Sequence, residues 1–190
     1  MAATQVSERH VFEARLVSIR PALRTDVPLI FELRRSERGG WLNPTSPDIC
    51  DQYEYFDKYQ MRFDSGDEIY FVMRDKRRGV ESGVTRVTEL LTPNKFGWEG
   101  LIIDKDTTPG CAIDLTTLIY LWGFTIAAKE KCGPWGVLKH HHRVNQLHAM
   151  MGVAQKIGED DIYWYYEVDK QDFQEWYPKF SKRGFGVLQV

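Results

Sequence analysis

Cysteine is scarce in this chain, and a block of one charge sign is absent. The three cysteines, Cys50, Cys111 and Cys132, share no metal-binding spacing, and an odd number does not suggest a disulfide framework. They fit a reducing cytoplasm. The formal net charge is −2 and there is no basic block, so neither nucleic acid nor a membrane is expected as a partner. The first residues carry charges where a secretory signal needs an apolar run, which also favours the cytoplasm.

The length and composition are those of one globular domain. A chain of 190 residues can bury one core and is short for two domains. We therefore expect an N-terminal arm, 1–13, and a single domain, 14–190. Aromatic residues make up 13% of the sequence, and their rings could serve as core, interface or substrate platform.

The stretch around which the chain is organised begins as a strand over 97–103, which carries bulky residues suited to a buried sheet. A long helix follows, from Ile113 to about Lys131. It is apolar almost all round, so we expect other elements to cover it on more than one side. The turn Pro109-Gly110-Cys111-Ala112 lies between strand and helix. Unpaired N–H groups and the positive end of the helix dipole make such a junction suitable for binding phosphate.

The rest of the sequence predicts further strands and helices in alternation. Strands are expected at 16–20, 68–74, 79–90, 135–139, 162–168 and, in the tail, 185–190. Helices are expected at 26–35, 47–63, about ten residues ending before Gly152, and 171–180. Gly133-Pro134 is expected to break the chain, and Ser46 to cap the second helix. This order predicts one α/β (α+β) domain with a mixed sheet.

Two motifs resemble those of the GCN5-related N-acetyltransferases, the GNAT superfamily. Thr107-x-x-Gly110-x-Ala112 is similar to the family's Q/R-x-x-G-x-G/A signature, with Thr107 in place of the leading Gln or Arg. The passage 137–153 is similar to the following strand and helix, with His141 where the family usually has Asn. The predicted order of elements is also the family's. The resemblance implies a mostly antiparallel sheet that splays between the family's strands 4 and 5, with helices on both faces.

The resemblance further implies acetyl-CoA as cosubstrate, and no metal. In the family, the turn's amides hold the pyrophosphate and the preceding strand pairs with the pantetheine. The cofactor-binding residues implied here are Leu101, Ile102, Ile103, Thr107, Thr108, Pro109, Gly110, Cys111, Ala112 and His141. Cys111 is expected to be a small residue in a crowded turn and not a nucleophile. The run His140-His141-His142 does not suggest a metal site, because adjacent strand residues point to opposite faces.

Two residues are candidates for catalysis. Glu99, on the central strand, could take a proton from the acceptor amine; alternatively it pairs with Arg86 across the sheet. His148 stands where many family members have the Tyr that protonates the leaving thiolate, and a histidine titrating near neutral pH could do the same. The alternative is a histidine held in place by its helix neighbours. Glu81 and Glu89 are weaker alternatives for the base.

The loop 36–45 lies where the family builds its acceptor pocket, so Trp41, Asn43 and Thr45 are the expected substrate-binding residues. In the run 163–166, one pair of aromatic side chains should face the core. The other pair should line a pocket or pack on a partner in a homodimer.

Three functions remain open at this stage. The first is acetylation of a nucleotide-linked amino sugar, because LNPT, WEGLII, PGCAID and GEDDIYWYYEV resemble GNAT proteins of bacterial surface-polysaccharide pathways. The second is acetylation of a protein N-terminus or a polyamine. The third is a non-catalytic GNAT-like module that binds CoA or serves as an interaction domain.

Overall fold

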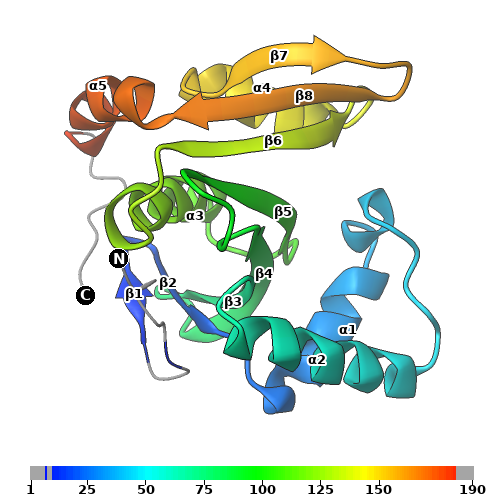
Figure 1. Ribbon diagram of the computed structural model, residues 1–190. Helices are drawn as coiled ribbons and strands as arrows, with labels where there is room; N and C mark the ends of the chain where they lie inside the picture. Colours follow the sequence, from blue (N-terminus) through cyan, green and yellow to red (C-terminus); the bar gives the residue numbers. More distant parts are fainter. Residues whose placement is uncertain (1–6, 8–9, 183–190) are drawn as a thin grey trace.

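The computed structural model describes residue 7 and residues 10–182. In this part of the chain one mixed sheet has the strand order β1-β2-β3-β4-β5-β6-β8-β7, and helices lie on both of its faces (Figure 1). The strand expected in the tail, 185–190, lies outside the described residues. The predicted α/β class and the mostly antiparallel sheet are confirmed.

The strands are β1 (Phe12–Glu13), β2 (Val17–Pro21), β3 (Ile69–Asp75), β4 (Val80–Thr88), β5 (Lys95–Ile103), β6 (Lys131–Leu138), β7 (Gln155–Glu159) and β8 (Tyr163–Asp169). The helices are α1 (Val27–Arg35), α2 (Ile49–Asp64), α3 (Cys111–Leu121), α4 (His142–Met151) and α5 (Lys170–Ser181). Short 3-10 turns at Arg24–Asp26 and Gly39–Trp41 flank α1.

Four details of the predicted elements were wrong. The α-helical part of the long helix ends at Leu121. The next residues, Trp122–Ile126, form one π-helical turn, in which the Ala127 amide donates to the Trp122 carbonyl. Gly133-Pro134 lies inside β6. The cap of α2 is Asp48, whose carboxylate accepts from the Cys50 amide at 2.8 Å. Strands β1 and β7 were not predicted. The boundary of the N-terminal arm at residue 13 stays a prediction.

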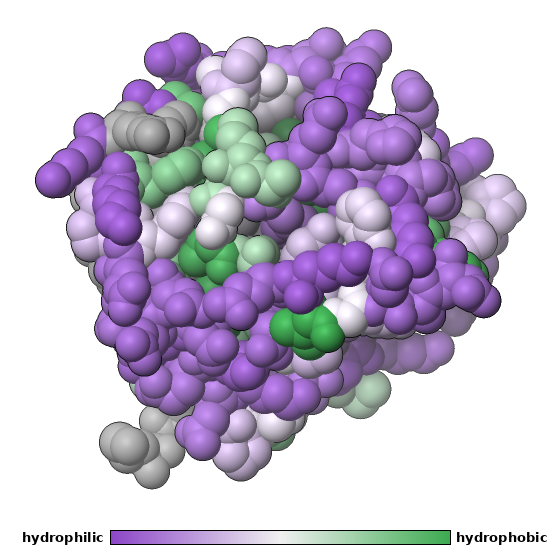
Figure 2. Space-filling model, turned by 90° about the horizontal axis from the view of Figure 1, so that it is seen from above, coloured by the Kyte–Doolittle hydropathy of each residue, from purple (hydrophilic) through white to green (hydrophobic). Residues whose placement is uncertain are grey.

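Two hydrophobic cores hold helices to the two faces of the sheet. The larger lies around α3, with Trp122, Phe96 and Phe71 among its fully buried side chains. The second lies under α1 and α2, where Phe56 and Tyr59 pack against inward side chains of β3, β4 and β5. Figure 2 shows one face of the molecule as mostly hydrophilic, with a few separate apolar spots. Burial of these apolar surfaces is the main favourable term in holding the layers together.

The sheet splays where β5 meets β6, as predicted. This parallel pair has only two registered positions among the described residues, Lys95 with Lys131 and Phe96 with Cys132. Beyond them, β5 bulges at Gly100, which has φ 65°, and β6 shifts register around Pro134, which has no N–H to donate. Figure 1 shows β6, β8 and β7 as a layer of their own above β3, β4 and β5. The divergence leaves space between the two halves of the sheet.

Candidate active site

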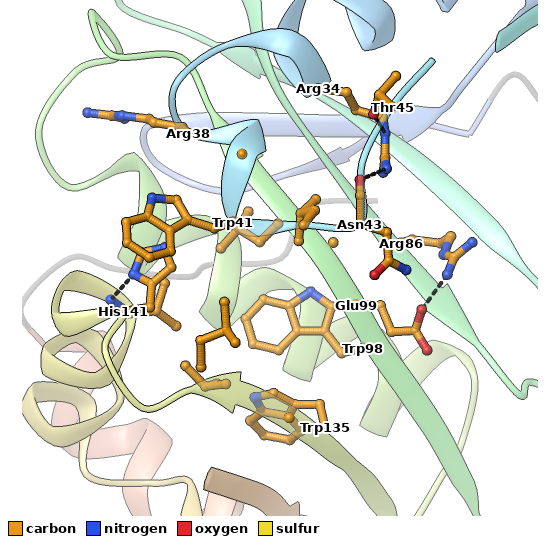
Figure 3. A pocket seen from close by; sticks show the side chains of 18 of the residues that line it. Arg34, Arg38, Trp41, Asn43, Thr45, Arg86, Trp98, Glu99, Trp135 and His141 are labelled. Carbon is orange, nitrogen blue, oxygen red and sulfur yellow. Dashed lines mark hydrogen bonds and ion pairs between the residues drawn. The ribbon is translucent and has the colours of Figure 1, made fainter. Parts of the chain in front are cut away.

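A cavity of about 910 Å³ lies at this divergence. Its walls come from residues 34–55, here called the α1–α2 segment, from Tyr70 of β3 and Arg86 of β4, and from β5, β6, α4 and β8 (Figure 3). Seven of the residues expected from sequence line it, namely Trp41, Asn43, Thr45, Glu99, Leu101, His141 and His148. The structure therefore brings the predicted acceptor loop, both catalytic candidates and part of the predicted cofactor strand to one place.

The acceptor loop is held by an arginine that sequence reasoning missed. Arg34, at the end of α1, donates from Nε to the Thr45 hydroxyl at 2.8 Å and from Nη2 to the Asn43 carbonyl at 2.9 Å. One bond holds the Thr45 side chain and the other the Asn43 backbone, so the Asn43 side chain remains available to a ligand (Figure 3). The Trp41 ring lies 4.6 Å from that of His141 and is 39% exposed, which leaves an aromatic face at the cavity.

Glu99 both lines the cavity and pairs with Arg86, its register partner on β4. The alternatives from sequence are thus compatible. Arg86 also binds the Tyr55 hydroxyl and lies 3.5 Å from buried Glu68. Burial disfavours its charge, but Tyr55, Glu99 and Glu68 outweigh burial and raise the pKa of Arg86. The guanidinium is therefore a fixed positive charge that orients the Glu99 carboxylate.

His148 is buried among aromatic rings, with 4% of its surface exposed. Its Nε2 accepts from Trp135 Nε1 at 3.4 Å, and its ring stacks on Tyr166 at 4.9 Å. Burial lowers the pKa of His148 to about 4. The expectation that it titrates near neutral pH is not met. At neutral pH it is a neutral imidazole that can donate a hydrogen bond from Nδ1.

The low pKa of His148 predicts a specific pH dependence of stability. Between pH 6.5 and 4 the unfolded histidine binds a proton and the folded one does not, so stability falls as pH is lowered through this window. The expected loss is about 3 kcal/mol of unfolding free energy. His148→Phe should remove this loss in urea unfolding curves taken across the window. His142→Phe, at an exposed position, controls for losing an imidazole. A slope unchanged by His148→Phe would contradict the assignment.

The start of α4 is built differently from the family pattern. His141, in the position of the family's Asn, is the N-cap, and its Nδ1 accepts from the Val144 amide at 3.4 Å. Burial lowers the pKa of His141, which favours this neutral, accepting form. Asn145, which sequence reasoning missed, donates to the carbonyls of Leu138 and Lys139 at 3.1 and 3.2 Å. It thereby holds the β6–α4 turn that carries His141 to the cavity.

The predicted phosphate turn lies apart from the cavity lining. Gly110, with φ 96°, is the N-cap of α3, a conformation that favours glycine. Among the described residues, the amides of Gly110, Ala112 and Ile113 donate to no protein acceptor, whereas the Cys111 amide donates to the Thr108 carbonyl at 3.1 Å. Three free donors at the positive end of a helix suit a phosphate.

One thiol and one carboxylate, both buried, lie on the inner side of this turn. Cys111 is 1% exposed, and burial raises the pKa of its thiol to about 11, which does not suit a nucleophile. The buried Asp75 carboxylate accepts from the Thr108 amide at 2.8 Å and from the Arg77 amide at 3.0 Å. Burial opposes ionisation of Asp75, but these backbone donors outweigh it and lower its pKa. Asp75 thus ties the phosphate turn to the β3–β4 turn.

The predicted cofactor strand divides its side chains between two environments. Leu101 lines the cavity, whereas Ile102 is buried in the second core, under α1 and α2. The Ile103 carbonyl accepts from Arg38 Nη1 at 2.9 Å. Pro109 is exposed and Thr107 is half-buried.

Two arginines and two tyrosines also line the cavity. Arg34 and Arg38 come from the α1–α2 segment, and Tyr163 and Tyr165 from β8. Alternation along β8 predicted that one aromatic pair would be free of the core, and the cavity is where that pair lies. No sequence signal distinguished the two arginines from surface charges.

Within the described residues, no group of three or more His, Cys, Asp or Glu side chains could hold a metal ion. In that same part of the chain, no helix combines the length and the apolar character needed to cross a membrane.

Comparison with known proteins gives matches in structure but not in sequence. No protein-family model and no curated protein matches the chain. The solved structure of apo FdhC, a nucleotide-linked sugar GNAT, is 28% identical with a TM-score of 0.80, and the match covers 93% of this chain and 99% of that chain. Spermidine N-acetyltransferase from Vibrio cholerae, in complex with CoA and spermine, is 17% identical with a TM-score of 0.69, covering 84% and 98%. A dodecameric structure of that enzyme is also similar, at 17% identity and a TM-score of 0.66, covering 83% and 96%.

Proposed function

Because the chain has the GNAT fold, we propose that it is an N-acyltransferase that moves an acetyl (acyl) group from acetyl-CoA directly to a primary amine. The acceptor we propose is a nucleotide-linked amino sugar. The observation that carries the proposal is the cavity at the splay between β5 and β6, where Glu99, His148 and the α1–α2 segment meet.

The proposed reaction has one tetrahedral intermediate. The neutral amine attacks the thioester carbonyl and forms the C–N bond, and the C–S bond then breaks to release CoA thiolate. Glu99 takes the amine proton, directly or through water. A free backbone N–H of β5 near Leu101 stabilises the oxyanion. His148, being neutral, donates a hydrogen bond to the departing sulfur; this replaces the proton transfer expected from sequence.

The cofactor would lie along the free edge of β5 and reach the N-terminus of α3. The free amides of Gly110, Ala112 and Ile113 suit its pyrophosphate. The edge of β5 beyond Phe96, which has no registered partner on β6, suits the amides of pantetheine.

The charges of the cavity favour a sugar nucleotide over a polyamine. Its carboxylates, Asp48, Asp51 and Glu99, are matched in number by three arginines. Glu99 is paired with Arg86, and Asp48 caps α2, so the net acidity that a polycation requires is lacking. Arg34 has no carboxylate partner among the described residues and can meet an anionic group. The exposed face of Trp41 can stack on a sugar ring or a base.

A polyamine acceptor is the second candidate, favoured by the fold shared with spermidine N-acetyltransferase. A protein N-terminus and a non-catalytic CoA-binding module are the remaining alternatives. The free cysteines, two of them buried, support the cytoplasm as the place of action. A homodimer stays a prediction from the sequence.

The test is a panel of acceptors assayed with acetyl-CoA by release of free thiol. Nucleotide-linked amino sugars are expected to give kcat/KM values at least about tenfold above those of the matching free amino sugars and of spermidine. A ratio of about tenfold is the effect expected from one charge-assisted contact to the nucleotide. Faster turnover of spermidine would favour the second candidate. Absence of a thermal shift at millimolar acetyl-CoA would favour an interaction module that does not bind CoA, whereas a shift without turnover of any acceptor would favour a non-catalytic CoA-binding module.

A further inference from the structure

The phosphate turn lacks the side-chain contact that its first position supplies in the family pattern. Thr107 occupies that position, and its hydroxyl donates to the Ser82 carbonyl at 3.4 Å. The Thr107 side chain is thus directed to β4. A diphosphate at the turn would meet backbone donors but no cation from position 107.

A guanidinium from elsewhere in the chain lies beside this position. Arg38 Nη1 donates to the Asp104 carbonyl at 3.0 Å, and the Thr107 amide donates to the same oxygen at 3.2 Å. Because both groups donate to the same oxygen, the Arg38 guanidinium lies next to the Thr107 amide. The second acceptor of Arg38 is the Ile103 carbonyl.

The Arg38 guanidinium also lies on the open edge of β5. The Asp104 amide donates to the Ser82 carbonyl, so residue 104 faces β4. Because alternate residues of a strand direct their polar groups to opposite neighbours, the Ile103 carbonyl faces the edge that β6 has left. Arg38 therefore occupies the path between the cavity and the phosphate turn.

Arg38 has hydrogen-bonding capacity to spare. Among the described residues its Nε and Nη2 donate to no acceptor, and it forms no ion pair with a carboxylate. Three arginines on β2 to β4 are paired with carboxylates: Arg20 contacts Asp26 at 2.6 Å, Arg74 contacts Glu81 at 3.3 Å, and Arg86 contacts Glu99. A half-buried, unpaired guanidinium with a fixed position matches the planar, bidentate recognition of phosphate.

We infer that Arg38 binds the pyrophosphate of the CoA donor and supplies, from the α1–α2 segment, the charge that position 107 lacks. The inference rests on the proposed function, since it takes acyl-CoA as the donor. Arg38 directly precedes the turn Gly39–Trp41, which carries Trp41 into the acceptor cavity.

The test measures binding of CoA and of dephospho-CoA by calorimetry, without any acceptor. Arg38→Gln is expected to raise the Kd of both ligands about 10- to 100-fold, the usual range for one charged phosphate contact. Adding Thr107→Arg to Arg38→Gln should restore at least about tenfold of the affinity by returning a cation to the turn. Arg24→Gln, which removes an exposed guanidinium paired with Asp57, is the matched control and should bind like the wild type. Melting curves check that each variant is folded.

Several results would overturn the inference. CoA affinity of Arg38→Gln within about twofold of the wild type would remove Arg38 from the site. A loss seen with CoA but not with dephospho-CoA would assign Arg38 to the 3′-phosphate instead. A loss that Thr107→Arg leaves unchanged would trace the effect to a displaced segment. Failure of the wild type to bind CoA would instead reject the proposed function itself.

Discussion

Replacing Gly110 by valine is expected to weaken acetyl-CoA binding at least about 100-fold, since it removes several charge-assisted contacts at once. Gly110 has φ 96°, and the free amides of Gly110, Ala112 and Ile113 cluster around it. A β-branched side chain would both strain this backbone and cover the donors that face the phosphate. Calorimetry with acetyl-CoA measures the effect.

The strain itself needs a control, because left-handed backbone costs about 1–2 kcal/mol for a non-glycine residue. Gly66→Val introduces a comparable strain at φ 80°, where nothing lies within 4 Å of the added carbon, far from the turn in sequence. Gly66→Val should lower the melting temperature and leave the affinity for acetyl-CoA unchanged. If Gly110→Val kept the wild-type affinity, the turn would not be the phosphate site.

Replacing Glu99 by glutamine is expected to lower kcat about 100-fold or more, the scale of losing a general base. The amide retains the size of the side chain but cannot take the amine proton. The loss should appear in kcat and kcat/KM alike, because the interaction is made in the transition state. Steady-state kinetics across pH 6 to 9 with the best acceptor of the panel supplies the measurement.

Glu89→Gln is the matched control for Glu99→Gln. Glu89 directly follows β4 and, like Glu99, pairs with a cation on the neighbouring strand, here Lys95 of β5 at 2.7 Å, but it does not line the cavity. Its replacement should leave kcat unchanged. If Glu99→Gln retained full turnover while its melting temperature fell, Glu99 would be only the partner of Arg86.

Local pattern was enough to predict most of the fold. The stepped apolar residues of α2 and the β-branched and aromatic runs of β3 and β8 give periodicities that survive in the structure. Strand β7 has no such pattern, because it is an edge strand with all five residues exposed. Pro134 misled the prediction of β6, since a proline is compatible with a strand where the register shifts.

The site was predictable where a motif fixed a position and not where distant residues meet. Trp41, Glu99 and His148 were placed at the cavity by their positions relative to strands and turns. The pKa of His148 depends on rings from three separate strands, Trp98, Trp135 and Tyr166, so no local sequence signal contains it. Likewise, the local sequence does not show the roles of Arg34 and Arg38, because these depend on hydrogen bonds to the carbonyls of Asn43 and Asp104.

The brief pairing of β5 with β6 leaves the sheet as two units that share few backbone hydrogen bonds. Across this seam the described halves share two registered pairs, and beyond them the contact is between rings such as Trp98 and Trp135, 5.7 Å apart. Rings can part without breaking a hydrogen-bonded ladder, so we expect the backbone amides that face this seam to exchange with solvent faster than those between β3 and β4. A ligand with amide groups, bound along the free edge of β5, would make the backbone hydrogen bonds that β6 does not make there. It would thereby couple the two units.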